Sequence, residues 1–166
     1  MLLMFIKHLI VMGLEIERKF LLKNSDWEQF IDREIFLRQG YLNSDMERTV
    51  RVRITDQKAF LTIKGKTENT TRQEFEYEIP IQDAESLIKL CESPLIEKTR
   101  FIVNYQNRVW EIDKFEGDNE GLVIAEIELT REDEEVTLPS WIGKEVSQDE
   151  RFYNSSLIKN PFKNWK

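Results

Sequence analysis

The feature of this sequence that most constrains its fold is a strict alternation of charged and apolar residues near the start of the chain. Within residues 14–22, Glu15, Glu17 and Lys19 stand at every second position, with apolar residues such as Ile16 between them. Side chains of a β-strand point to opposite faces in turn, so a strand here would place these three charges on one face. That face cannot be an ordinary apolar core.

The same alternation returns in further segments of the chain. They carry Arg51 and Arg53; Thr62 and Lys64; Arg72, Glu74, Glu76 and Glu78; Lys98 and Arg100; and Glu126 and Glu128. One such segment alone is most simply an amphipathic strand with a solvated charged face. Several segments with neighbouring like charges argue against that interpretation, because like charges repel unless a ligand or ion lies between them. The pattern therefore predicts a barrel with a charged interior.

The fold class expected is mainly β within the α+β class: an eight-stranded antiparallel closed barrel, or tunnel, with a charged lumen and helices packed on the outside. Turn residues separate the strand candidates. These candidates are residues 14–22, 34–43, 48–55, 58–65, 72–80, 96–105, 108–116 and 122–131. Short helices are predicted from Ser25, over residues 82–92 and near 149–159.

The length of 166 residues predicts one domain, over residues 14–166, with residues 1–13 as an N-terminal extension. Because Met12-Gly13 directly precedes the first predicted strand, we expect the natural start at Met12. The alternative is a short helix or strand that packs on the body of the domain. The apolar segment is too short to span a membrane, and His8, the only histidine, lies in it. Histidine-based catalysis is therefore not expected.

Charge and cysteine content limit the compartment and the partners. The single cysteine, Cys91, cannot form an internal disulfide, which favours a reducing compartment, and we expect the protein to be cytoplasmic. A net charge of −7 does not fit a protein that binds nucleic acid on its surface. The expected ligand is a small, highly charged anion inside the barrel. No membrane partner is expected, and a homodimer is a hypothesis that the sequence does not test.

The inward residue types suit a phosphorylated ligand and a metal ion. Arginine offers a planar fork to phosphoryl oxygens and lysine a movable point charge. Carboxylates in the same cavity would repel a phosphate unless a divalent cation lay between them. Clustered glutamates without histidine or cysteine ligands favour a hard ion, Mg²⁺ or Mn²⁺.

In order and spacing, the charged residues resemble the pattern of the CYTH superfamily, the triphosphate tunnel metalloenzymes. The resemblance runs from residue 14 to about 157 and is greatest to the short, single-domain bacterial members. It rests on Glu15-x-Glu17-x-Lys19, Arg51-x-Arg53, Lys64, Arg72-x-Glu74-x-Glu76, Lys98-x-Arg100, Asp113 and Glu126-x-Glu128. The segments 38–42, 96–100, 145–146 and 151–154 are also similar to segments of that family.

The resemblance implies a role for each group of residues. Phosphate oxygens would be held by Lys19, Arg51, Arg53, Lys64, Lys98 and Arg100. The metal would be bound by Glu15, Glu17, Glu126 and Glu128, with Asp113 assisting. Arg72, Glu74 and Glu76 would support the site. Tyr41, Lys19 and Glu17 are the candidate catalytic residues; Tyr41 resembles a proposed proton acceptor, although a tyrosine pKa near 10 makes it a poor base unless cations lower it.

The function that the resemblance implies is hydrolysis of the terminal phosphoanhydride of a small triphosphate in the presence of a divalent metal. Inorganic triphosphate is the expected substrate, because the short chain shows no obvious pocket for a base. Three alternatives stay open: an adenylate cyclase or a thiamine or nucleoside triphosphatase of the same family, a polyphosphate-binding module without catalysis, and a purely structural barrel. The acidic set argues against the second, because an anion sensor has no need of metal-binding glutamates.

Overall fold

A computed structural model describes residues 13–165, which form one antiparallel β-barrel with short helical segments. The predicted extension and the expected start at Met12 lie outside the described residues, except for Gly13. The strands are β1 (Leu14–Leu22), β2 (Ile31–Asn43), β3 (Arg48–Ile54), β4 (Ala59–Gly65), β5 (Thr71–Ile79), β6 (Ile96–Tyr105), β7 (Arg108–Phe115), β8 (Val123–Glu128) and β9 (Ile142–Glu145). The helices are α1 (Ile81–Ile88) and α2 (Asn154–Leu157), and the 3₁₀ turns are η2 (Asp26–Phe30), η3 (Gly117–Asn119), η4 (Glu150–Phe152) and η5 (Phe162–Asn164).

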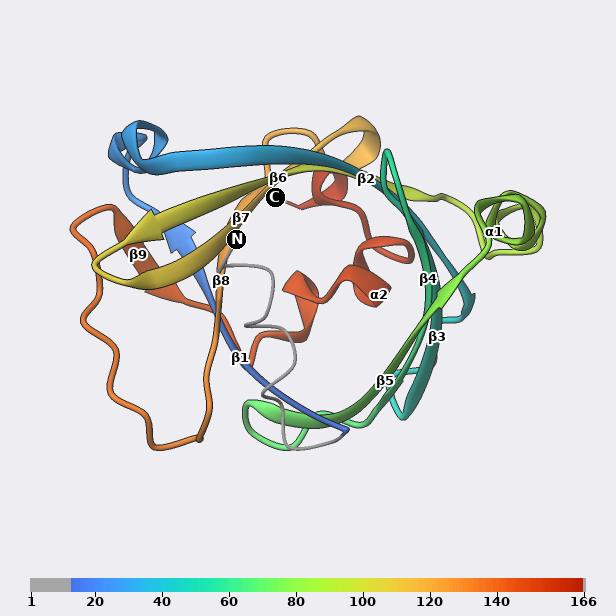
Figure 1. The fold of residues 1–166 in the computed structure, drawn as a ribbon, viewed down its shortest axis with the longest axis horizontal. Coiled ribbons are helices and arrows are strands. Elements are labelled where there is room, and N and C mark those ends of the chain that lie inside the picture. Colours follow the sequence, from blue (N-terminus) through green and yellow to red (C-terminus); the bar gives the residue numbers. More distant parts are fainter. Residues whose placement is uncertain (1–12, 166) are drawn as a thin grey trace.

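The first strand closes the barrel because it pairs on both of its edges. The strand order is β5-β4-β3-β2-β6-β7-β8-β1-β9, with an additional pairing of β5 with β1. The N-terminal part of β1 pairs with β5, as in Glu15 with Arg72, and the rest pairs with β8, as in Lys19 with Glu126. Eight strands therefore form a complete ring, seen end-on in Figure 1, and β9 adds to β1 outside it.

The predicted eight-stranded antiparallel barrel is confirmed, with differences at the ends of elements. All eight predicted strands form, and β2 begins three residues earlier because Ile31 pairs with Val103 of β6. β9 was not predicted: four residues are too short for a clear alternation. The predicted helix 82–92 ends at Ile88, after which Leu90 and Cys91 donate backbone N–H groups only three residues back. Near 149–159 the chain forms η4 and α2 instead of one helix.

Two apolar clusters pack against the outer face of the barrel. One joins Phe20, Trp110 and Ile127 with Trp141, which precedes β9. The other places Ala84 and Ile88 of α1 against Val52 of β3. Helix α1 thus lies outside the ring, as Figure 1 shows, and its apolar side covers strands whose opposite face carries the charges. Inverting the usual sheet, with apolar residues outward, is possible because these elements shield them from water.

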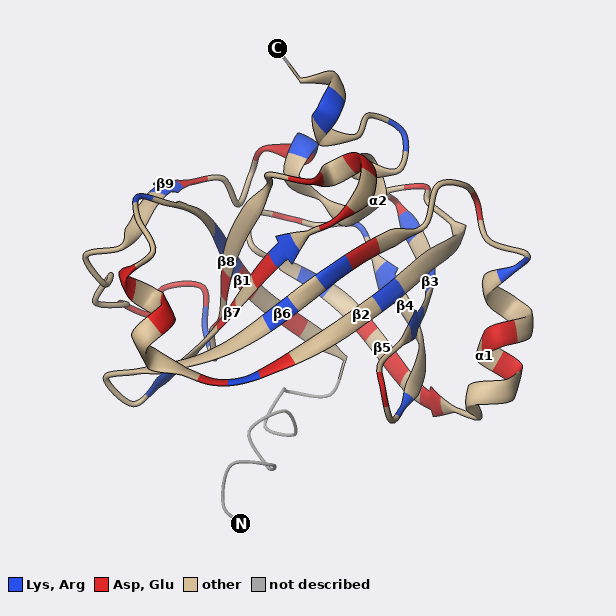
Figure 2. Ribbon diagram, turned by 90° about the horizontal axis from the view of Figure 1, so that it is seen from above, with Lys and Arg blue, Asp and Glu red and all other residues tan. Residues whose placement is uncertain are grey.

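A third apolar cluster closes one end of the barrel. Phe152, Leu157 and Ile158, from η4, α2 and the residue that follows, pack with Ile96 and Ile124 of the barrel wall. Figure 1 shows α2 within the outline of the ring, and in the perpendicular view of Figure 2 it lies over one mouth. The predicted outer position therefore holds for α1, whereas α2 covers an end of the tunnel. None of the helices within residues 13–165 combines the length and apolar character of a membrane-spanning helix.

Candidate active site

The barrel interior contains an unusual set of buried cations. All six lysines and arginines predicted to bind phosphate are buried, with exposed fractions between 1% for Lys98 and 8% for Arg53 and Arg100. They come from four strands, β1, β3, β4 and β6, at the alternate positions that the sequence pattern predicts. Lysine and arginine are almost never buried without partners. Each of these cations accordingly faces a carboxylate.

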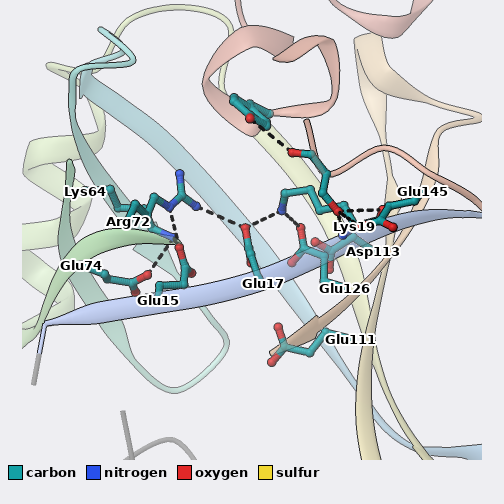
Figure 3. Close-up of polar contacts among 12 residues, drawn as sticks. Glu15, Glu17, Lys19, Lys64, Arg72, Glu74, Glu111, Asp113, Glu126 and Glu145 are labelled. Atoms are coloured by element: carbon teal, nitrogen blue, oxygen red, sulfur yellow. Dashed lines mark hydrogen bonds and ion pairs between the residues drawn. The ribbon is translucent and has the colours of Figure 1, made fainter. Parts of the chain in front are cut away.

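Strand β1 carries the centre of this network, which Figure 3 shows in close-up. Lys19 Nζ lies between Glu126, its closer partner, and Glu17 Oε1 at 2.7 Å. Arg72 of β5 bridges Glu15 and Glu17, with Nε 2.5 Å from Glu15 Oε2. Burial opposes the charge of Lys19, yet Glu126 and Glu17 raise the pKa of Lys19 above its usual value. Lys19 is therefore a fixed positive charge in the wall of the tunnel.

Lys64 of β4 completes the β1 side of the network. Its ammonium lies 2.8 Å from Glu15 Oε1 and 2.9 Å from Glu74 Oε2. Burial alone would raise the pKa of Glu15, but the charges of Lys64 and Arg72 hold that pKa well below its usual range. Burial and the nearby Glu15 raise the pKa of Glu74 to about 6, against the attraction of Lys64. The paired glutamates thus differ: Glu15 is firmly anionic, whereas Glu74 is the weaker acid.

On the wall formed by β6, β7 and β8, Arg100 holds three carboxylates. It donates to Asp113 through Nε at 2.6 Å and Nη2 at 2.7 Å, to Glu126 at 2.9 Å, and to Glu111. Lys98 also pairs with Asp113, which is completely buried. Burial and the neighbouring Arg100 lower the pKa of Lys98 to about 8, although Asp113 opposes the shift. Asp113 is thus anchored between two cations.

The two arginines of β3 are less fully paired than Arg100. Arg53 Nη2 lies 3.0 Å and Arg51 Nη2 3.4 Å from the same Glu76 oxygen. Thr62 donates its hydroxyl to that oxygen at 3.0 Å. Within residues 13–165, the buried Nε atoms of both arginines have no hydrogen-bond partner. Burial, together with Arg51, lowers the pKa of Arg53 to about 10. These guanidiniums have donor capacity left for a ligand.

Tyr41 of β2 lies in the cavity, where Lys19, Arg51 and Arg72 also line the wall. It is 4% exposed. Burial raises its pKa although the nearby cations act in the other direction. Tyr41 therefore keeps its proton near neutral pH, and this raised pKa favours a role as hydrogen-bond donor over one as proton acceptor.

The carboxylates predicted to bind metal lie along neighbouring strands. Glu15 and Glu17 are on β1, and Glu128 is opposite Glu17 in the register of β8. Glu128 is exposed, unlike Glu126. Among the described residues, no three acidic, histidine or cysteine side chains form a ready-made metal cluster. The donor chemistry nevertheless fits a hard divalent cation, because the described cavity offers oxygen ligands, the carboxylates foremost, and the present partners of these carboxylates are exchangeable side-chain cations.

Several lining residues were missed by the sequence reasoning. Glu111 of β7 pairs with Arg100, but it stands in a strand whose other charges are not of one sign. Ser147, Tyr153 and Asn154 line the cavity from the C-terminal segment, where no strand alternation marks them. Gln39 of β2 is completely buried, and its uncharged side chain gave no signal in a search for charges. Alternation with Tyr41, two residues on, could have placed it inside.

The fold and its interior define a class of protein: a closed barrel whose lumen is lined by paired lysines, arginines and carboxylates, suited to a small polyanion with a cation. The chain belongs to the CYTH domain family, whose model matches residues 13–156.

Similar proteins with assigned activities share nearly the whole chain. The inorganic triphosphatase of Acetivibrio thermocellus is 46% identical over 156 residues, which cover 93% of this chain and 99% of the relative. That of Nitrosomonas europaea is 34% identical over 150 residues, covering 86% and 95%. A crystal structure of an inorganic triphosphatase is similar with a TM-score of 0.62 and 32% identity, covering 87% of this chain and 93% of the other.

Proposed function

We propose that this protein hydrolyses inorganic triphosphate to pyrophosphate and phosphate with the help of a divalent cation. The observation that carries the proposal is the interior of the barrel, where each buried lysine and arginine lies against a carboxylate. The two inorganic triphosphatases that share 46% and 34% of their residues with this chain support the choice of substrate.

Binding would exchange partners within the network. Burying ion pairs costs several kcal/mol per ion before the attraction is counted, so a dry lumen of this kind is a poor stabiliser of the fold. It is, however, well suited to a ligand that brings both signs. Triphosphate would take over Lys64 and the unused donors of Arg51 and Arg53, and Glu15, which Lys64 now holds, would turn to the cation. Each charge would keep a partner throughout.

We assign the phosphate-binding role to the six buried cations and the metal-binding role to Glu15, Glu17, Glu126 and Glu128. Asp113 supports the site by fixing Arg100 and Lys98, which both contact it. In a similar way, Glu76 holds Arg53 of β3, and Glu74 holds Lys64 of β4. A divalent cation bound by the carboxylates would neutralise phosphoryl charge and ease deprotonation of the attacking water. Family members that act on triphosphates use divalent metals, and we propose Mg²⁺ or Mn²⁺ here.

The reaction would be an in-line displacement at the terminal phosphorus. The oxygen of water forms a bond to phosphorus, the bond to the bridging oxygen breaks, and pyrophosphate leaves with the electron pair. One proton of the water stays on the phosphate product, and the other passes through solvent to the released pyrophosphate. Arg51, Arg53 and Lys19 would stabilise the charge spread over the equatorial oxygens, which is the main catalytic contribution in such reactions. Glu17 would orient Lys19 at 2.7 Å, and Tyr41 would donate a hydrogen bond to a phosphoryl oxygen.

The other activities considered have weaker support. A cyclase or a nucleoside or thiamine triphosphatase would need a site for an organic group, and the cavity is lined mainly by charged and hydroxyl side chains. A non-catalytic sensor does not explain buried glutamates that repel its ligand. We further propose that the protein works in the cytoplasm, where its single Cys91 stays reduced, and that nucleic acids and membranes are not partners.

The test is a phosphate-release assay with purified protein. Tripolyphosphate, ATP, thiamine triphosphate and pyrophosphate are compared with Mg²⁺, with Mn²⁺ and with excess chelator. We expect one phosphate per tripolyphosphate, pyrophosphate as the remaining product, and no turnover with chelator. Faster release from ATP or thiamine triphosphate would assign a different substrate, and turnover that chelator does not affect would remove the proposed metal site.

A further inference from the structure

The wall of the tunnel contributed by β2 differs from the others. In the ring, β1 and β2 are separated by three strands on either side, so β2 stands opposite Glu15, Glu17 and Lys19. The inward positions of β2 include Gln39 and Tyr41 and carry no charge. Leu37 lies on the same inward face, opposite Lys98 of β6. A ligand held by the charged strands would therefore meet uncharged side chains on this side.

Gln39 is buried in a way that is unusual for a glutamine. Its exposed fraction is 0%, and neither its amide nitrogen nor its amide oxygen has a hydrogen-bond partner within residues 13–165. Buried polar side chains nearly always have partners, and an exception calls for an explanation such as an absent water or ligand. Two unpaired polar atoms on one side chain make a purely structural role a costly one.

The neighbours of Gln39 identify the kind of ligand. Gln39 is opposite Arg53 in the register of β3, on the same inward face, and Tyr41 is opposite Arg51. Among the described residues, the Nε atoms of Arg51 and Arg53 also lack hydrogen-bond partners. Unpaired donors of three buried side chains thus lie on two adjacent strands. Such a set fits an acceptor-rich anion that can receive several hydrogen bonds at once.

We propose that Gln39 is a substrate-binding residue whose amide N–H donates a hydrogen bond to a phosphoryl oxygen, while its carbonyl accepts from Arg53 Nε. This assignment rests on the proposed triphosphatase function and extends it to a residue without charge. The amide would hold Arg53 in register with the bound phosphoryl group and bind the anion without adding to the repulsion among the cations.

The substitution Gln39→Met tests this directly, because methionine has a similar length and removes both polar atoms. A hydrogen bond to a charged group corresponds to roughly a 10- to 100-fold change in affinity. We expect two calorimetric titrations with tripolyphosphate, one at fixed Mg²⁺ and one with chelator in place of the metal, each to show a loss of affinity of that size. The melting temperature should be unchanged or higher, since two unpaired buried atoms are removed. Gln73→Met, on the outward, exposed side of β5, is the matched control.

A second variant keeps the inference falsifiable if Gln39→Met folds poorly. Gln39→Glu preserves the shape but replaces the donor by a carboxylate, so its affinity for tripolyphosphate should fall further than that of Gln39→Met. Wild-type affinity in both variants would overturn the role of Gln39. Binding by the wild type without phosphate release would instead refute the proposed hydrolysis and leave the role of Gln39 in anion binding intact.

Discussion

Replacing Arg53 by methionine should separate activity from stability, because the same buried charge that binds phosphate burdens the fold. Arg53 is 8% exposed, and burial lowers its pKa from the usual value of an arginine to about 10. A lowered pKa in a basic group means that the folded protein disfavours the charged form. With about 1.4 kcal/mol for each pKa unit, the penalty is on the order of 3 kcal/mol.

The loss of activity follows from the contact that Arg53 would make with substrate. A unit charge 4 Å from a phosphoryl oxygen contributes about 4 kcal/mol at an effective dielectric constant near 20, and a charged hydrogen bond roughly 1.5–3 kcal/mol. At about 1.4 kcal/mol per factor of ten, kcat/KM should fall by about 100- to 1000-fold. The partner Glu76 keeps Arg51 and Thr62, so it is not left unpaired.

The measurement compares phosphate release from tripolyphosphate with thermal unfolding for Arg53→Met and for Arg48→Met. Arg48 is on the same strand but on the exposed, outward side. We expect the Arg53 variant to lose activity with an equal or higher melting temperature, and the Arg48 variant to keep both. Wild-type kcat/KM in Arg53→Met would refute the reasoning, as would a loss of activity that merely follows a loss of folded protein.

Three other predictions concern metal binding, the packing at Gly40 on the outer face of β2, and thermal stability at low pH. Glu17→Gln should raise the metal concentration for half-maximal activity about tenfold or more, while tripolyphosphate binding without metal stays equal or tightens because a competing anion is gone; an unchanged metal requirement would contradict the role of Glu17. Gly40→Ala should lower the melting temperature by several degrees, since the new Cβ would lie 2.7 Å from Cys91 Cβ and overpacking costs about 1–3 kcal/mol; an unchanged value would show that the loop yields. At Glu134, burial alone would raise the pKa, but hydrogen bonds from Thr130 and Arg108 lower the pKa of Glu134 to about 2, so its contribution is present above pH 4.5 and lost as the pH falls toward 2. The melting temperatures of wild type and Glu134→Gln should therefore converge between pH 5 and 2.5, and a constant difference would count against this linkage.

The sequence predicts the barrel well because one periodicity governs most of it. Alternation with a period of two is a direct consequence of strand geometry, and the charged residues of β1, β3, β4, β6 and β8 reveal which face is inward. The outward position of apolar residues such as Phe20 and Val52, which reverses the usual arrangement of a β-sheet, could be predicted from the same alternation.

The features that the sequence did not predict lie in segments that are too short for a clear alternation or that carry no charged residues. β9 is held by pairing with Phe20 and Leu22 of β1, a tertiary contact that four residues cannot encode locally. The covering of one mouth by α2 depends on Leu157 meeting a particular set of wall residues. The sign of the Tyr41 pKa shift depends on how burial compares with nearby cations, which only the three-dimensional arrangement determines. Gln39 carries no charge and so gave no signal.

The most direct test of the central claim is a crystal structure with Mn²⁺ and a slowly hydrolysed imido analogue of tripolyphosphate, with the metal located by its anomalous scattering. We predict the anion inside the ring, contacting Arg51, Arg53 and Lys64, and an anomalous peak beside Glu15 and Glu17. An anion or metal bound outside the barrel, with the internal ion pairs unchanged, would contradict the account.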